Sequence, residues 1–235
     1  MTRQLDLVEL LHLLGHELRS PAGVLIGYVR MLQEGRFSSE ADRVRIYDKM
    51  RASLTRVTGL GDAVSQLTSW IERPERPAVL VDANELLDRS FAAARAAHDR
   101  PLETEMHVPP GAARISVKDG QALEAAVAAV IQATAREAGD APVAVRATVR
   151  RDREPAVEVV VGPKARLLAE ATAGKDAGPS LSSEGTEEFA IGRGGMGLSL
   201  VLATVVLDAH AARVWTAAGN CSIAGVRLPV AAEEQ

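Results

Sequence analysis

Two long segments near the N-terminus repeat apolar residues at spacings of three and four, and this pattern constrains the fold more than any other feature. The segments cover about residues 4–32 and 40–72. Residues three and four apart share one face of an α-helix, so both segments are expected to be amphipathic helices. The turn between them contains Ser38 and Ser39, either of which is suited to cap the second helix.

A hairpin of two such helices buries only one face of each helix. Two hairpins packed together as a four-helix bundle would complete the core. The pattern therefore predicts a homodimer, with Met31, Met50, Leu67 and Trp70 in the core of the bundle.

Pro74 and Pro77 mark a domain boundary, since proline interrupts regular structure. We expect one domain over residues 1–73 and a second over 78–235. The second alternates strand and helix patterns, which predicts an α/β sandwich and an α+β chain as a whole. The expected strands cover residues 78–81, 102–108, 115–117, 143–150, 156–161, 212–217 and 225–230. The expected helices cover 84–98, capped by Asp82 or Asn84, 121–137, capped by Asp119, and 198–209, with a loop over 163–192.

Composition excludes several classes of protein. The net charge of −4 argues against general nucleic-acid binding. The one cysteine, Cys221, suits a reducing compartment. No apolar run reaches the ~18–20 residues of a membrane span, and the start of the sequence, with Asp6 and Glu9, lacks the plan of a signal peptide. We therefore expect a cytoplasmic protein without a membrane or nucleic-acid partner.

A polar cluster interrupts the first helical segment. It consists of His16, Glu17, Arg19 and Ser20, followed by Pro21. We expect His16 on an exposed flank, where a neutral imidazole nitrogen can attack phosphorus. Glu17 would act as general base or orient the ring, and Arg19 would offset phosphate charge. A surface or interface histidine without chemistry is the simpler alternative.

Residues 15–32, GHELRSPAGVLIGYVRML, resemble the phospho-acceptor box of the two-component sensor histidine kinases, S-H-E-[LI]-[RK]-[TN]-P-L followed by an apolar run. Ser20 and Ala22 depart from that pattern. The resemblance implies a dimeric hairpin, phosphoryl transfer through His16, and a response-regulator receiver domain as partner. It also implies that Ser20 positions a water for dephosphorylation of the partner. Because the sequence begins almost at the box, we expect sensing to come from a partner, such as a separate sensor kinase.

The second domain resembles the ATP-binding domain of these kinases, which is related to the gyrase and Hsp90 ATPases. Residues 192–200, GRGGMGLSL, are similar to the family's G-x-G-L-G-L-[AS] box, and His210 is similar to its H-G-G segment, with Ala211 and Ala212 in place of the glycines. Glycines before a helix let backbone N–H groups approach phosphate. The alternative is a flexible lid hinge. The candidates for contact with ATP phosphates are Gly192, Gly194, Gly195, Gly197 and Leu198.

Two further boxes of that family are not matched. Ala129 and Ala133 stand where the family has two asparagines, one of which holds Mg²⁺. Val161 stands near the place of the aspartate that binds adenine. Phosphoryl transfer without these groups loses positioning and charge stabilisation. We expect ATP and Mg²⁺ to bind weakly or not at all, and autokinase activity to be impaired. His12 and His16 lack a third ligand, so no metal site is predicted.

Three functions remain open at this point. The first is a degenerate histidine kinase that exchanges phosphate between His16 and a receiver aspartate. The second is a non-catalytic pseudokinase scaffold that regulates a kinase or response regulator. The third is an active ATP-dependent histidine kinase with unusual Mg²⁺ ligands.

Overall fold

The computed structural model describes residues 7–72, 75–98, 100–151, 153–167, 186–188, 196–217 and 220–231. The chain divides into two compact units, Met1–Ser69 and Trp70–Gln235. The first unit ends at Ser69 rather than at residue 73 because Trp70, which is 4% exposed, packs in the hydrophobic core of the second unit. The prediction that Trp70 belongs to the core of the helical bundle is therefore wrong.

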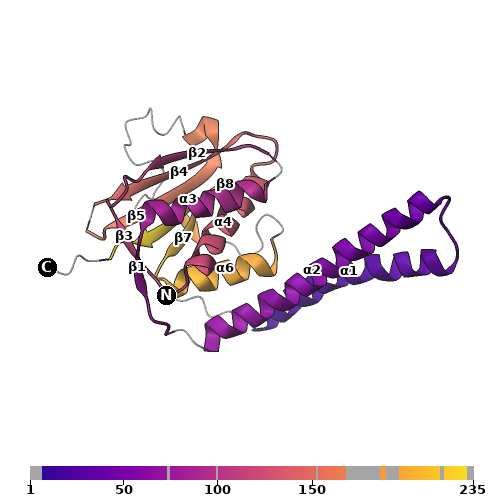
Figure 1. Cartoon of the computed structure of the whole chain (residues 1–235). Helices are drawn as coiled ribbons and strands as arrows, with labels where there is room; N and C mark the ends of the chain where they lie inside the picture. The colour runs from indigo at the N-terminus through magenta and orange to yellow at the C-terminus, as the bar shows by residue number, and fades with distance from the viewer. Residues whose placement is uncertain are drawn as a thin grey trace. The chain divides into compact units, whose positions relative to one another are not determined.

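The first unit contains α1 (Leu7–Gln33) and most of α2 (Glu40–Glu72), which form a hairpin (Figure 1). Both helices lie where the apolar spacing predicted them. Ser39 caps α2, since its side-chain oxygen accepts a hydrogen bond from the backbone N–H of Asp42 at 3.2 Å. The predicted helical hairpin is confirmed.

Each helix of the hairpin buries one face and exposes a second apolar stripe. In α2 the buried side chains are Ile46, Ser53, Ala63 and Leu67. The stripe that α1 leaves exposed, called here the α1 stripe, consists of Val8, Leu11, Leu18 and Val29, which are 74%, 57%, 37% and 40% exposed. α2 likewise exposes Val44, Tyr47 and Leu54.

In its described residues, the second unit contains two sheets and the helices α3, α4 and α6 (Figure 1). Six strands form one mixed sheet in the order β2-β4-β5-β8-β7-β6, in which only β2 and β4 pair in parallel among the described residues. β1 and β3 form a separate antiparallel pair. The elements are β1 (Val79–Asp82), α3 (Ala83–Ala96), β2 (Leu102–His107), β3 (Arg114–Val117), α4 (Gly120–Glu137), β4 (Val143–Arg150), β5 (Ala156–Pro163), β6 (Thr186–Glu188), α6 (Leu198–Ala209), β7 (Arg213–Ala217) and β8 (Asn220–Pro229).

Helices α3, α4 and α6 cover one face of the six-stranded sheet (Figure 1). Two of them begin at the predicted caps. Asp82 accepts a hydrogen bond from the N–H of Asn84 at 2.7 Å, and Asp119 accepts one from the N–H of Ala122 at 3.0 Å. The central helix, α4, is buried almost continuously from Ala126 to Ala135. Helices packed on a mixed sheet confirm the predicted α+β architecture.

The structure corrects the expected strands at two places. β6 lies inside the stretch 163–192 that was expected to be a loop, and β5 extends into the same stretch as far as Pro163. β8 begins at Asn220 rather than at Gly225. β6 and the start of β8 pair with β7, and the end of β5 pairs with β4, so tertiary pairing rather than local alternation makes these segments strands.

Candidate functional site

The four predicted acceptor residues lie in the middle of α1. His16, Arg19 and Ser20 are exposed, and Glu17 is half-buried. At ~100° per residue, Arg19 and Ser20 follow His16 on the same side of the helix, whereas Glu17 is turned away from it by ~100°. The structure thus groups His16, Arg19 and Ser20 on one face and sets Glu17 toward the side that packs in the hairpin.

His16 points away from both apolar faces of α1. Leu14 belongs to the half-buried face, and Leu18 belongs to the exposed α1 stripe. Because each is two residues from His16, helix geometry places His16 about 160° around the axis from both. A second helix packed on the α1 stripe would therefore leave the imidazole open to a phosphoryl donor.

The positions of the Mg²⁺ ligands in the kinase pattern are apolar and closed. Ala129 is 8% exposed and Ala133 is fully buried, and both belong to the hydrophobic core of the second unit. Leu200, Ala203 and Leu207 of α6 belong to the same core. The space beside these two alanines is therefore filled by side chains.

The neighbouring polar residues of α4 do not replace the missing ligands. Thr134 is fully buried, and its hydroxyl donates to the carbonyl oxygen of Val130 in its own helix at 2.9 Å. Gln132 is half-buried, and it lies about 100° around the helix from Ala133. Magnesium requires oxygen ligands in octahedral geometry, and these side chains offer no such set. The described residues contain no group of three His, Cys, Asp or Glu side chains placed to hold a metal ion.

The adenine position is equally apolar. Val161 is 1% exposed in β5 and packs in the core, where the kinase pattern has a carboxylate. An amino group on a purine would meet hydrocarbon there, without a hydrogen-bond acceptor from this side chain. At these three described positions, Ala129, Ala133 and Val161, the side chains therefore do not fit the contacts to Mg²⁺ and adenine that the fold family implies.

The glycine-rich turn is described only at its end. Gly192, Gly194 and Gly195 lie outside the described residues. Gly197 precedes α6 with φ +53°, a left-handed conformation that favours glycine, and its carbonyl accepts the N–H of Leu200 at 3.1 Å. Leu198 is 1% exposed, so its side chain packs inward. Of Gly197 and Leu198, therefore, only the backbone N–H groups could contact an anion.

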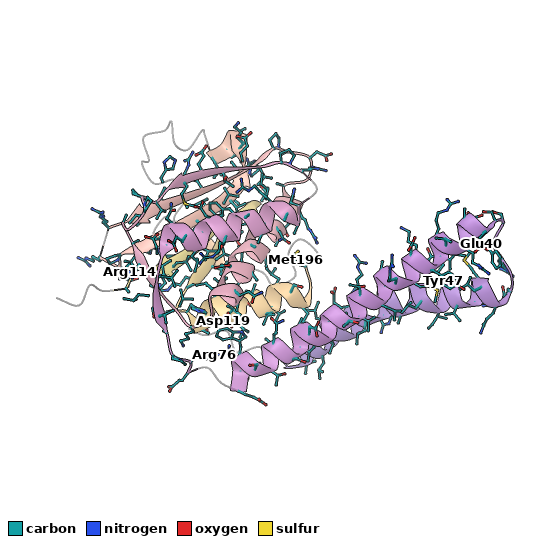
Figure 2. The ribbon with its side chains drawn as sticks, in the orientation of Figure 1. Glu40, Tyr47, Arg76, Arg114, Asp119 and Met196 are labelled. Carbon is teal, nitrogen blue, oxygen red and sulfur yellow. The ribbon has the colours of Figure 1, made fainter. Side chains whose placement is uncertain are left out.

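Sequence reasoning missed one polar cluster of the second unit. Around His210, which is 5% exposed, lie Trp70, Arg76 and the Lys118–Asp119 segment. Figure 2 labels Arg76 and Asp119 of this cluster. Trp70 was assigned to another core, and Arg76 stood in the expected linker, so no local signal connected them. Within this cluster, His210 stood out in the sequence through its resemblance to the H-G-G segment, and Asp119 stood out as the expected cap of α4.

No family model and no curated protein matches the sequence. Among solved structures, the chain is similar to the histidine kinase AdeS of Acinetobacter baumannii, with 14% identity and a TM-score of 0.59 over 92% of this chain and 98% of that one. It is also similar to the histidine kinase ThkA, solved in complex with the response regulator TrrA, with 15% identity and a TM-score of 0.56 over 94% of this chain and 61% of that one.

At these identities the likeness establishes the fold. The chain has the fold of the histidine kinases, and the fold that the acceptor box implied is confirmed. In the described part of the chain, no helix combines the length and the apolar character needed to cross a bilayer.

Proposed function

We propose that this chain is a degenerate histidine kinase that works in two-component signalling. It accepts a phosphoryl group on His16 and exchanges it with an aspartate of a response-regulator receiver domain, without making phosphohistidine from ATP. The observation that carries the proposal is the exposure of His16 on a face of α1 directed away from both apolar faces of the helix.

The α1 stripe supports a homodimer. Four large apolar side chains on one helix, together with those that α2 exposes, leave apolar surface on the hairpin that a second copy can bury. A groove of about 630 Å³ at the turn of the hairpin is lined by the further large apolar side chains Tyr28, Met31 and Phe37. A second copy would cover this apolar surface in a four-helix bundle and leave His16 outside.

The transfer itself needs few groups. A ring nitrogen of His16 attacks phosphorus, an N–P bond forms, and the P–O bond to the donor aspartate breaks to release its carboxylate. The proton of the imidazole passes to water, because Glu17 is turned about 100° away from His16, and Arg19 stabilises the charge on the phosphoryl oxygens. The reverse reaction returns the phosphoryl group to a receiver aspartate. Ser20 orients a water for hydrolysis of the partner's aspartyl phosphate.

The partner follows from the fold. ThkA, whose fold this chain shares, forms a complex with a response regulator. A receiver domain is therefore the proposed partner of the hairpin. Because the Mg²⁺ and adenine positions are closed by alanine and valine, the phosphate on His16 would originate from a separate kinase.

Phosphoramidate, a small donor that phosphorylates imidazoles, tests the acceptor directly. We expect acid-labile, alkali-stable phosphate on the wild-type chain and none on His16→Ala. The matched control is His12→Ala, because His12 is exposed one turn earlier on the same helix and its loss should leave labelling unchanged. Equal labelling of His16→Ala, or no labelling of the wild type, would refute the acceptor role.

Incubation with ATP and Mg²⁺ separates the alternatives. We expect no label, because the ligand positions are apolar. Label on His16 from ATP would instead establish an active histidine kinase. The pseudokinase scaffold is favoured by the same closed positions; it predicts a dimer that takes no phosphate from phosphoramidate and binds its partner equally well with His16→Ala.

A further inference from the structure

A column of four side chains connects the last turn of α2 with the start of α4 and the end of α6. The guanidinium carbon of Arg76 lies 4.0 Å from the centre of the Trp70 ring, and the His210 ring lies 5.6 Å from it at an angle of 54°. Arg76 also pairs with Asp119 at 3.6 Å, and Figure 2 shows these two residues together. Trp70 and His210 are 4% and 5% exposed, so the two rings are buried, whereas Arg76 and Asp119 are half-buried at the edge of the second unit.

Two backbone groups fix the tautomer of His210. The N–H of Lys118 donates to Nε2 at 3.0 Å, so Nε2 must carry a lone pair. Nδ1 lies 2.7 Å from the carbonyl oxygen of Val206, which can only accept, so Nδ1 must carry the proton. The neutral ring satisfies both partners, and each partner belongs to the backbone of a different element.

A proton on Nε2 would break this arrangement. It would face the N–H of Lys118, a donor against a donor, and it would place a positive charge in a buried position. The charged groups around the ring are Lys118 and Arg76, which disfavour that charge, and Asp119, which favours it. Burial is the largest influence and lowers the pKa of His210 below its usual 6.5, although the hydrogen bond to Val206 opposes it.

We propose that His210 is a proton-operated lock that holds Trp70 in the core of the second unit, with Arg76 against its ring, and releases both side chains in mild acid. The lock is independent of phosphotransfer through His16. Its neutral form holds Trp70 through ring contact and holds the Lys118–Asp119 segment, to which Arg76 is paired. Its charged form loses the Lys118 hydrogen bond and repels Arg76, so the Trp70 side chain is freed.

The direction of the pH dependence follows from linkage. The locked state has a lowered His210 pKa, so the released state binds more protons. The lock is at full strength above pH 6.5 and weakens as the pH falls below it. The equilibrium constant for release grows by up to about tenfold for each pH unit, until the pH passes the lowered pKa of the locked state, where it levels off.

Tryptophan fluorescence can follow the release, because the chain has two tryptophans. Trp215→Phe leaves Trp70 as the fluorophore. We expect its emission to shift to longer wavelength, as for an indole entering water, between pH 7.5 and pH 5, with a midpoint below 6.5. In the matched control, Trp70→Phe, the remaining Trp215 should not shift. Adding His210→Gln to Trp215→Phe should abolish the transition, since the amide does not titrate in this range.

The unmodified chain provides a second measurement, should a tryptophan variant fail to fold. Nitrogen-15 NMR of the histidine rings should report the Nδ1–H tautomer for His210 at pH 7.5, and its titration should coincide with the movement of the Trp70 indole signal. The lock is refuted by the Nε2–H tautomer at that pH, by a Trp70 transition that survives His210→Gln, or by a Trp70 signal that stays constant down to pH 5.

Discussion

The indole ring of Trp215 in β7 lies over Gly225 of β8, its register partner in the six-stranded sheet. A Cβ built on Gly225 would come closer to the ring than 3.0 Å, a separation that real Cβ atoms essentially never show. Trp215 is 1% exposed, and it packs with Val160, Leu167 and Ile223. The glycine is therefore required by the position of the tryptophan.

Gly225→Ala should destabilise the second unit by about 1–3 kcal/mol, because overpacking in a rigid core displaces neighbours. Urea denaturation monitored by circular dichroism will measure the loss. The double variant Gly225→Ala/Trp215→Leu replaces the indole with a smaller side chain. Its loss of unfolding free energy should be smaller than the sum of the losses in the two single variants. Strict additivity would show that the two residues do not compete for space.

Leu18→Glu should dissociate the proposed homodimer. The substitution puts a charge in the α1 stripe, and burying an unpaired carboxylate against a second copy should weaken association at least about tenfold. Light scattering at micromolar concentration will compare the variant with His12→Glu, a charge on the face of α1 that holds His16. If both variants stay dimeric, the α1 stripe does not lie in the interface.

Gly23→Ala should stabilise the hairpin by about 0.5–1 kcal/mol. Gly23 lies inside α1, a Cβ there meets nothing within 4 Å, and alanine favours helix over glycine. The control is Gly35→Ala in the turn, where φ is +67° and a Cβ also meets nothing, so the same change should destabilise through the backbone alone. The urea midpoint of each variant measures both effects, and a shift of the same sign would contradict the expectation.

Ala211→Gly should stabilise the second unit by about 0.5–1 kcal/mol. Ala211 has φ +54°, and α6 ends there with the N–H of Ala212 bonded to the carbonyl of Leu207 and the N–H of Ala211 to that of Asp208. This pattern is a Schellman motif, which normally has glycine at the left-handed residue. Relief of about 1–2 kcal/mol of strain outweighs the extra freedom of the unfolded chain. Ala209→Gly, at the last residue of the helix, should be destabilising when measured in the same way.

Local rules predicted most elements from the sequence. The bounds of α2 and β4 agree with the sequence reading, because their periodicity is long and regular. The caps at Ser39, Asp82 and Asp119 were also predictable, since a capping side chain bonds within its own turn. These features depend on residues only a few positions apart.

What the sequence could not predict depends on distant contacts. β6 has three residues, Thr186–Glu188, with no alternation, and it is a strand because β7 pairs with it. Trp70 fits the helical pattern of α2, but which core receives its side chain is a tertiary matter. The loss of asparagine at positions 129 and 133 was visible in the sequence, whereas the burial of the two alanines required the structure.

The alanines of α4 have a consequence for how such a chain can change over generations. A lost metal-ligating residue is simple to regain while its cavity remains, but here Ala129 and Ala133 are buried among apolar side chains. Asparagine at either position would bury an amide without a partner, at ~1–3 kcal/mol each, before it gained any nucleotide. If the chain descends from a nucleotide-binding ancestor, reversal one residue at a time is disfavoured. Each substitution back to asparagine lowers the stability of the fold before nucleotide binding is restored.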